Sequence, residues 1–423
     1  MNISIIGTGY VGLVTGVCFA KLGNKVICVD INEKKIEMIN KGVPPIYEEG
    51  LEQVLVENKN RIEATRDYRY AIQNTDVTFI CVGTPSEDDG SIDLKFVKEA
   101  AEEIGEQLRN KDGWHLVVVK STVLPGTTGE VVLPLLERYS GKKAGVDFGV
   151  AMNPEFLREG IAVRDFLEPD RIVIGYYDDK SREVLRKLYS SFSCPIVETS
   201  LSAAEMIKYA SNAFLATKIS FINEIGNRSK KIGIDTYEVA SGIGMDKRIG
   251  RAFLGSGIGW GGSCFPKDLN ALRYWAKEIG EKIDIINSVI EVNRKQPLRM
   301  IDLLKKHIPN LNGKTVGVLG LAFKPYTDDI RESRSIPVVR RLLEEKAIVK
   351  AYDPKAMDNF KKVFPHITYC SSAVTVLEGS EAVLIIKKWD EFRRLDYSGK
   401  IVIDGRRVLE AKKTARIYEG VCW

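Results

Sequence analysis

The chain has 423 residues, of which 44% are hydrophobic and 28% are charged, and its formal net charge is +5. This length supports two or three domains with full hydrophobic cores, and the balance is that of an ordinary soluble protein. No basic tract is interleaved with aromatic residues, so we expect no nucleic-acid partner, and the mild positive excess fits an anionic small-molecule substrate.

Cysteine and histidine usage narrows the chemistry. Seven cysteines occur without a Cys-x-x-Cys pair, which argues against a disulfide scaffold and against a metal site. None of the three histidines lies in a motif, so we expect no histidine general base. Neither a signal peptide nor an apolar run of membrane-span length is evident, so we expect a cytoplasmic protein without a membrane partner.

The first part of the chain alternates short apolar strands with amphipathic helices, the pattern of a parallel α/β sheet. A helix follows Gly9. We expect strands at 3–6, 25–30, 77–82, 116–120, 148–151, 171–175 and 195–197. This domain is predicted to cover residues 1–199.

The middle of the chain is predicted to be helical. Residues 201–231 contain no proline and one glycine, Gly226, which indicates one long helix. Further helices are expected to about residue 307, so we predict a helical connector at 200–311, a kind of region that often dimerises.

A second α/β pattern begins at residue 312. Strands are expected at 315–319, 348–352, 382–386 and 401–403, and helices at 336–345 and 374–377. The predicted fold class is therefore α/β, with two Rossmann-like doubly wound domains at 1–199 and 312–423. A long central helix and a helical dimerisation region are predicted to join them.

A glycine fingerprint, Gly7-Thr8-Gly9-Tyr10-Val11-Gly12, follows the first strand and opens a helix, which is the context of dinucleotide binding. The amides at the start of that helix are predicted to hold a pyrophosphate, and Asp30 ends the next strand at the spacing of a ribose contact. A carboxylate there repels a 2′-phosphate, which favours NAD over NADP. Lys34 and Lys35 keep NADP open, because basic residues can accommodate that phosphate.

Other polar residues occur where an α/β sheet binds ligands. Thr84 and Thr122 each follow a strand, so each is a candidate cofactor contact or a capping threonine. Lys208 and Asn212 lie four residues apart on the long helix and share a face. They can together hold a developing oxyanion, or they can be two exposed polar residues.

Two further segments have ligand-binding character. Asn153-Pro154-Glu155-Phe156-Leu157-Arg158-Glu159-Gly160 follows a strand and places two carboxylates beside an arginine. Glu155 or Glu159 can position water or contact sugar hydroxyls, or both can simply favour the amino end of a helix. The loop Phe253-Leu254-Gly255-Ser256-Gly257-Ile258-Gly259 is expected to wrap a ligand, because Phe253 and Trp260 argue against a flexible linker.

The octapeptide Gly261-Gly262-Ser263-Cys264-Phe265-Pro266-Lys267-Asp268 is the most distinctive segment. Its glycines let backbone amides approach a ligand, Lys267 can favour a thiolate at Cys264, and Asp268 can transfer protons. A nicotinamide cofactor together with a cysteine nucleophile suggests oxidation through a thiohemiacetal and a thioester.

These motifs together resemble the UDP-glucose/GDP-mannose dehydrogenase family over essentially the whole chain. The resemblance also includes Gly320-Leu321-Ala322-Phe323-Lys324-Pro325, Thr327-Asp328-Asp329-Ile330-Arg331-Glu332-Ser333 and Asp404-Gly405-Arg406-Arg407. It implies an NAD-dependent oxidoreductase that acts on a CH–OH group by two successive hydride transfers. Within the family, the segment 245–250 points to UDP-glucose, which would be oxidised to UDP-glucuronate with two NADH per sugar.

The resemblance also implies roles for individual residues. Cys264 would carry the thioester, Lys208 and Asn212 would stabilise oxyanions, Asp268 would orient Lys208 or a water, and Glu155 with Thr122 would serve the hydrolytic water. Which group is the base stays open. The implied neighbours of the cofactor are Glu159, Lys267, Arg331 and Lys35. The implied nucleotide-sugar pocket comprises Phe156, Leu157, Phe253, Leu254, Gly255, Ser256, Gly257, Gly261, Phe323, Lys324 and Arg407, besides the catalytic residues.

Arg248 resembles an arginine that reaches the sugar across a subunit interface, which implies a homo-oligomer, at least a dimer. Trp260 departs from relatives that carry phenylalanine or tyrosine there, and the segment 419–423 matches no motif of the family. Three alternatives remain: another nucleotide sugar (GDP-mannose or a UDP-N-acetyl-hexosamine), a two-electron β-hydroxyacid dehydrogenase, and a non-catalytic NAD sensor. Cys264 argues against the second and the full set of catalytic side chains against the third.

Overall fold

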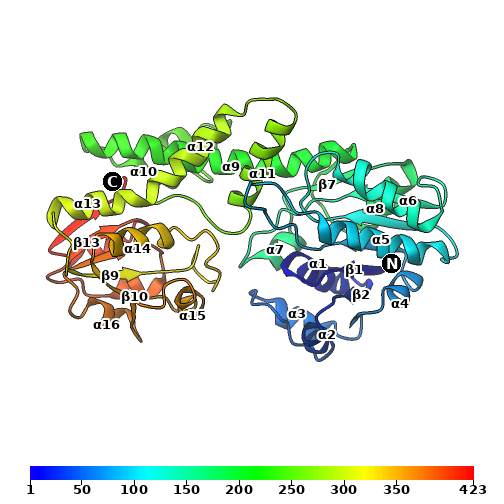
Figure 1. The fold of residues 1–423 in the computed structure, drawn as a ribbon, viewed down its shortest axis with the longest axis horizontal. Helices are drawn as coiled ribbons and strands as arrows, with labels where there is room; N and C mark the ends of the chain where they lie inside the picture. Colours follow the sequence, from blue (N-terminus) through cyan, green and yellow to red (C-terminus); the bar gives the residue numbers. More distant parts are fainter. The chain divides into compact units, whose positions relative to one another are not determined.

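A computed structural model describes residues 1–423, and the chain divides into two compact units, Met1–Ser211 and Asn212–Trp423 (Figure 1). Each unit is built around its own sheet, and the long helix α9 (Leu201–Ser229) passes from the first unit into the second. The predicted fold class, two Rossmann-like units with helices between them in the chain, is confirmed. The predicted three-part division at residues 199 and 311 stays a prediction.

The first unit contains an eight-stranded sheet with strand order β3-β2-β1-β4-β5-β6-β7-β8. Its strands are β1 (Asn2–Ile6), β2 (Lys25–Val29), β3 (Ile62–Thr65), β4 (Val77–Ile80), β5 (His115–Val119), β6 (Phe148–Met152), β7 (Ile172–Tyr176) and β8 (Ile196–Thr199). Its helices are α1 (Tyr10–Lys21), α2 (Glu33–Asn40), α3 (Leu51–Glu57), α4 (Tyr68–Gln73), α5 (Lys95–Arg109), α6 (Leu133–Ser140), α7 (Ala162–Leu167) and α8 (Asp179–Leu188).

One part of this sheet differs from the expectation of parallel strands throughout. β7 pairs with β6 in antiparallel fashion, and β8 runs parallel to β7, so these two strands reverse direction. The sequence did not reveal the reversal, because β7 is mostly buried and such apolar strands have the same composition in either direction. Strand β3 was also missed, since its alternating pattern spans only four residues.

Both faces of the first sheet are covered, which explains its continuous apolar strands. In β1, Ile3 and Ile5 pack into the core that contains α1, whereas Ile6 packs into the core that contains α5. A strand buried on both faces loses the polar alternation of a half-exposed strand. The carboxyl ends of β1, β4, β5 and β6 emerge at one edge because these neighbouring strands are parallel, and the polar residues of the site follow them.

The second unit contains a six-stranded, fully parallel sheet in the order β11-β10-β9-β12-β13-β14. Its strands are β9 (Thr315–Leu319), β10 (Ile348–Tyr352), β11 (Thr368–Tyr369), β12 (Ala382–Ile385), β13 (Ile401–Asp404) and β14 (Ile417–Gly420). Its helices after α9 are α10 (Thr236–Gly244), α11 (Phe265–Glu278), α12 (Asp284–Lys295), α13 (Arg299–His307), α14 (Ser335–Glu344), α15 (Met357–Lys361) and α16 (Ala373–Leu377). The segment 419–423, which matched no motif, thus begins inside an edge strand.

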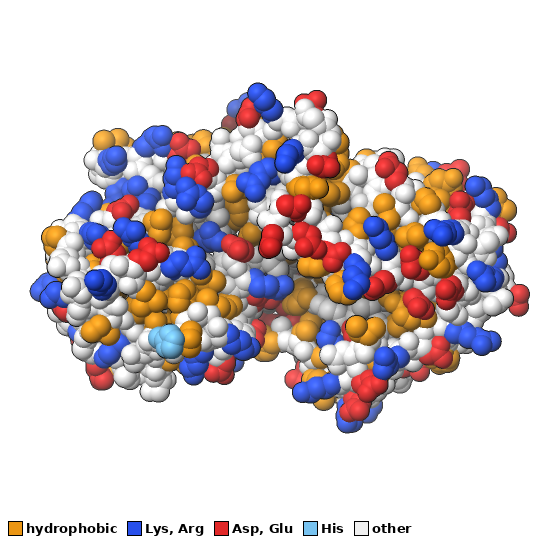
Figure 2. Space-filling view, in the orientation of Figure 1, with side chains coloured by type: hydrophobic (Ala, Val, Ile, Leu, Met, Phe, Trp, Pro, Cys, Tyr) orange, Lys and Arg blue, Asp and Glu red, His pale blue; other side chains and the backbone are white.

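The helices and the surface carry two general features. None of the helices combines the length and the apolarity needed to cross a bilayer. On the face that Figure 2 shows, lysine and arginine are interspersed with aspartate and glutamate. That face therefore carries mixed charge rather than one field of a single sign.

Candidate active site

The glycine fingerprint borders a cavity of about 1120 Å³ at the carboxyl ends of β1 and β4. Gly7 has φ of 93°, and a Cβ there would press on the backbone of Cys81 and Val82. A Cβ at Gly9, in contrast, would meet no protein atom within 4 Å. Packing within the protein therefore does not require a glycine at position 9, and the bare backbone leaves room for a pyrophosphate.

Asp30, the predicted ribose contact, lines this cavity. Its Oδ2 accepts hydrogen bonds from Thr8 N (2.9 Å) and Thr8 Oγ1 (2.5 Å), and Lys35 Nζ lies 3.6 Å away. Burial opposes ionisation, but the hydrogen bonds from Thr8 and Asn32 and the charge of Lys35 hold the pKa of Asp30 below its ordinary value. The lowered pKa keeps the Asp30 carboxylate ionised. Of the two neighbouring lysines, Lys35 lines the cavity and Lys34 does not.

Tyr10 of the fingerprint does not line this cavity and makes its contacts elsewhere. The Tyr10 hydroxyl contacts Glu48, and Gly160 N donates to both Tyr10 Oη (3.0 Å) and Glu48 Oε2 (2.6 Å). Glu48 also accepts from Ala162 N at 2.6 Å. Tyr10 thus joins the cofactor helix to the segment that carries Glu155 and Glu159. Sequence reasoning missed Glu48, because nothing in this loop distinguishes it from the neighbouring Glu49.

Three adjacent parallel strands each end in a predicted site residue: Thr84 follows β4, Thr122 follows β5 and Glu155 follows β6. Thr84 Oγ1 donates to the carbonyl of Thr122 at 2.9 Å, so it fixes the neighbouring turn. Lys208 Nζ lies 2.8 Å from Glu155 Oε1 in a buried ion pair. The structure thus gathers these side chains at one sheet edge, where α/β folds bind ligands.

The charge state of Glu155 follows from this pair. Burial opposes its ionisation, but the charge and hydrogen bond of Lys208, the amide of Leu157 (2.6 Å) and the charge of Lys120 together lower its pKa. Lys208 and Asn212 are only 3% and 7% exposed, so the alternative of two exposed polar residues on α9 is wrong. Phe156 packs in the same region, with its ring 5.5 Å from Lys208 Nζ.

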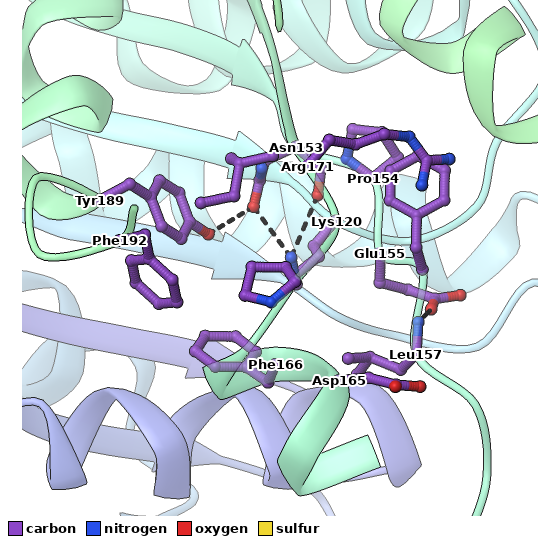
Figure 3. Close-up of a pocket in the computed structure, with 13 residues that line it drawn as sticks. Lys120, Asn153, Pro154, Glu155, Leu157, Asp165, Phe166, Arg171, Tyr189 and Phe192 are labelled. Carbon is purple, nitrogen blue, oxygen red and sulfur yellow. Dashed lines mark hydrogen bonds between the residues drawn. The ribbon is translucent and has the colours of Figure 1, made fainter. Parts of the chain in front are cut away.

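Sequence reasoning also missed Lys120. Figure 3 shows its ammonium group pointing to Asn153, with Nζ 2.9 Å from Asn153 Oδ1 and 3.3 Å from the Asn153 carbonyl. Tyr189 Oη donates to the same amide oxygen at 2.6 Å. A cavity of about 50 Å³ lies among these residues and Glu155. Burial lowers the pKa of Lys120 to about 8, so this is a costly buried cation rather than a surface lysine.

The octapeptide forms the start of α11 in the second unit. Cys264 is the N-cap residue of that helix and is exposed, and its Sγ lies 3.6 Å from Ser263 Oγ. The amino end of a helix favours a negatively charged thiolate. Asp268, one turn later, is buried and donates its amide to the Cys264 carbonyl at 2.9 Å.

Asp268 connects two other predicted residues. Its Oδ2 accepts from Asn212 Nδ2 at 2.6 Å, and its Oδ1 lies 2.7 Å from Lys267 Nζ. Asp268 therefore orients the amide that was predicted to hold an oxyanion. Lys267 was predicted to favour a thiolate at Cys264. Its ammonium group instead pairs with Asp268, which lies one helical turn after that cysteine.

The glycine-rich loop 253–259 is rigidly held and is not a flexible linker. Gly257 N donates to Asn223 Oδ1 at 2.7 Å, and the Gly257 carbonyl accepts from Gln296 Nε2 at 2.6 Å. Asn293 exchanges two hydrogen bonds with the backbone of Trp260, at 2.8 and 3.0 Å. These amide side chains were missed, because single amides on helices give no signal in the sequence.

The segment 323–332 packs on the octapeptide. A Cβ at Gly261 would lie 2.0 Å from the Glu332 carbonyl, and a Cβ at Gly262 would lie 2.7 Å from the Phe323 ring. Both glycines are thus required by close packing. Lys324 Nζ lies 5.3 Å from the Phe323 ring, whereas the exposed Arg331 pairs with Asp329 at 2.6 Å.

Two adjacent arginines follow β13. Arg407, the predicted substrate residue, places Nη1 2.6 and 2.7 Å from the two carboxylate oxygens of Asp235 and stacks over the Tyr237 ring at 4.2 Å. Arg406 donates to the Gly259 carbonyl at 3.2 Å, so it contacts the glycine-rich loop directly. The sequence motif contained both arginines but did not separate their roles.

Comparisons with known proteins identify the family. Domain models of the UDP-glucose/GDP-mannose dehydrogenase family match the chain as NAD binding domain over residues 1–193, central domain over 202–295 and UDP binding domain over 317–411. The chain is 49% identical to UDP-glucose 6-dehydrogenase AglM of Haloferax volcanii, with 98% of each chain covered. It is 43% identical to UDP-glucose 6-dehydrogenase TuaD of Bacillus subtilis, with 99% of this chain and 93% of that protein covered.

Solved structures show the same similarity. A UDP-glucose dehydrogenase from Pyrobaculum islandicum is 46% identical, with a TM-score of 0.96 over 100% of this chain and 98% of that chain. A UDP-D-ManNAc dehydrogenase from Pyrococcus horikoshii is 30% identical, with a TM-score of 0.87 over 100% of this chain and 99% of that chain. The matched segments cover most of the sequence, and the chain belongs to the UDP-glucose/GDP-mannose dehydrogenase family.

Proposed function

We propose that this protein oxidises UDP-glucose to UDP-glucuronate and reduces two NAD molecules per sugar. The observation that carries the proposal is the exposed Cys264 at the amino end of α11, one turn from the buried Asp268, in a chain that also has a large cavity beside its glycine fingerprint. The relatives named UDP-glucose 6-dehydrogenase support the choice of substrate.

The Gly7–Gly12 turn and Asp30 would hold NAD, which would supply the hydride acceptor for both oxidations at the sugar C6. In the first oxidation the C6 hydroxyl loses a proton and a hydride and becomes an aldehyde. The Cys264 thiolate then forms a C–S bond to C6, and the aldehyde oxygen takes a proton to give a thiohemiacetal. Asn212, oriented by Asp268, and Lys208 stabilise the negative oxygen in these steps.

The second oxidation converts the thiohemiacetal to a thioester with loss of another hydride and the hydroxyl proton. Water then attacks the thioester carbon, the C–S bond breaks, and the sulfur leaves as a thiolate. Glu155 accepts the proton of the water in this proposal. Its lowered pKa keeps it ionised near neutral pH, which a proton acceptor requires. Thr122 and Lys208 orient this step.

We also propose that the protein is a homo-oligomer. Phe214 and Phe221 lie seven residues apart on α9 and are 65% and 51% exposed, which is unusual for large apolar side chains of a monomer. The Arg248 side chain is 89% exposed and pairs with the neighbouring Asp246 at 2.6 Å, at a surface that a second copy can reach. Light scattering on the wild type and on Phe221→Asp tests this, with a smaller particle expected for the variant.

The stoichiometry of NADH tests the function directly. Purified protein, limiting UDP-glucose and excess NAD are expected to give two NADH per sugar. One NADH per sugar would instead support a two-electron dehydrogenase, and the absence of turnover with UDP-glucose would contradict the proposed substrate. A parallel series with GDP-mannose and UDP-N-acetyl-hexosamines identifies any preferred alternative sugar.

A further inference from the structure

The segment Gly420–Trp423 is inserted into the second unit rather than lying on its surface. It leaves the edge strand β14 and is anchored by hydrogen bonds to α10 and to the end of α9. The Cys422 carbonyl accepts from Thr236 Oγ1 at 2.5 Å, and Lys230 Nζ donates to the Trp423 carbonyl at 2.9 Å. Cys422 is fully buried. Nothing in the mechanism above uses this segment.

Two glycines provide the space for it. A Cβ at Gly226, the lone glycine of α9, would lie 2.8 Å from the Cys422 Cβ. A Cβ at Gly420 would lie 2.1 Å from Trp423 Nε1. A glycine inside a helix costs about 1 kcal/mol relative to alanine, so its presence in the last turn of α9 needs a reason. Seating Cys422 against α9 is that reason.

The Trp423 side chain contacts the arginine that follows β13. Its ring packs edge-on against Tyr237 with centroids 5.6 Å apart, and the Arg407 guanidinium lies 4.2 Å from the Tyr237 ring and 5.9 Å from the Trp423 ring. Asp235 accepts two hydrogen bonds from Arg407 Nη1 and a third from Tyr237 N. Arg407 has φ of 59°, a conformation that a non-glycine residue holds only under constraint.

The same cluster holds the glycine-rich loop. Tyr237 Oη donates to the Ser256 carbonyl at 2.9 Å. Gln296 Nε2 contacts both the Gly257 carbonyl (2.6 Å) and Cys422 Sγ (3.6 Å). Cys422 and Trp423 thus support, through Gln296 and Tyr237, the two carbonyls at the centre of the loop that is expected to hold the nucleotide sugar.

On the basis of the function proposed above, we infer that Trp423 is a positioning residue for nucleotide-sugar binding. It holds Arg407 and, through Tyr237, the 253–259 loop in the binding conformation, while Cys422 seats the segment against Gly226. Trp423 itself does not need to touch the ligand. Losing it leaves the chemical groups in place and lets the loop and Arg407 populate other conformations, so the affinity falls by the populated fraction.

The experiment compares Trp423→Ala, Trp423→Phe and the wild type by calorimetric titration with UDP and by steady-state kinetics. Trp423→Ala is expected to weaken UDP binding and raise KM for UDP-glucose by about tenfold, the size of a lost aromatic–cation contact. KM for NAD and kcat are expected to stay within about twofold, because the cofactor site is untouched. Trp423→Phe is expected to recover most of the affinity.

Two controls separate positioning from general destabilisation. Trp114→Ala removes a half-buried tryptophan of the first unit that packs on Lys180 at 4.4 Å, and it is expected to lower Tm without changing UDP affinity. Gly226→Ala pushes on Cys422 from the other side and is expected to weaken UDP binding with Trp423 intact. Unchanged UDP affinity in Trp423→Ala, or an equal loss for NAD and UDP, would overturn the inference. A wild type that binds UDP but does not oxidise UDP-glucose would contradict the proposed function alone.

Discussion

Each of the two sheets has a glycine turn after its first strand, and the two turns have different roles. In the first unit Gly7 has φ of 93°, and Thr8 N donates to Asp30, at the end of β2. In the second unit Gly320 has φ of 95°, and Leu321 N donates at 2.7 Å to Asp353, at the end of β10. The strand, the glycine turn and the carboxylate correspond in both, which is what a shared doubly wound topology predicts.

The difference lies beside the carboxylates. Asp30 borders the large cavity, whereas Asp353 is 0% exposed and also accepts hydrogen bonds from Ala322 N, Lys355 N and Ala356 N. A Cβ at Gly320 would lie 2.5 Å from the Lys387 Cβ, so the Lys387 backbone and side chain close the space next to the turn. We therefore expect the glycine turn and its carboxylate to bind a ligand in the first unit and to stabilise the fold in the second.

The largest expected effect separates chemistry from cofactor binding. Cys264→Ser is expected to lower steady-state NADH production by at least about 10³-fold, because a serine hydroxyl is a poor nucleophile without an activating base. NAD affinity, measured by titration, is expected to be unchanged, since the dinucleotide cavity is formed entirely by the first unit. Full activity would refute nucleophilic catalysis, and a loss of NAD affinity would show that the two units are not independent in this respect.

Substituting each carboxylate tests the comparison itself. Asp353→Ala is expected to cost about 4 kcal/mol of unfolding free energy, because four backbone N–H groups lose a buried acceptor. Asp30→Ala is expected to raise KM for NAD by at least about tenfold with a smaller loss of stability, because it removes a ligand contact at a cavity wall. Chemical denaturation and NAD kinetics on both variants give the two readouts. Equal patterns in the two variants would contradict the division between ligand and fold.

Much of the fold and part of the candidate site could be predicted from the sequence. The two sheets, α9, the glycine turn and Asp30 follow from periodicity and local spacing, since each lies within a short segment. The octapeptide was informative for the same reason. Asp353 was not singled out, because its role depends on Gly320, thirty-three residues earlier, and on its complete burial.

Contacts between distant segments explain the remaining misses. Glu48, Lys120 and Asn293 each bond to a backbone group that is far away in the sequence, and such a contact leaves no local pattern. The seat of Cys422 on Gly226 joins positions 196 residues apart, so neither residue alone indicated it. The direction of β7 was not predicted, because a buried apolar strand has the same sequence pattern whether it runs parallel or antiparallel to its neighbour.

Buried lysines extend the comparison to pH. Burial lowers the pKa of Lys120 to about 8, against an ordinary value of 10.5. Between these values the unfolded chain binds more protons than the folded one, so this group makes stability rise with pH, by at most about 3 kcal/mol in total. Urea denaturation from pH 7 to 10.5 is expected to show a steeper rise for the wild type than for Lys120→Met. Parallel curves would mean that Lys120 does not titrate in this range.

Lys387 gives the smallest and most selective test. It is fully buried beside Gly320, its Nζ has no hydrogen-bond partner, and burial together with Arg406 and Arg334 lowers its pKa well below the ordinary value. Unlike Lys120, which bonds to Asn153, it gains nothing for its desolvation. Lys387→Met keeps the packing next to Gly320, so it is expected to raise the free energy of unfolding by about 1–2 kcal/mol.

The neighbouring Lys388→Met is the matched control, because that side chain is exposed and its removal is expected to change stability by less than about 0.5 kcal/mol. A loss of stability in Lys387→Met would mean that the ammonium is stabilised inside the protein. It would also mean that a polar contact, rather than packing, closes the space next to Gly320.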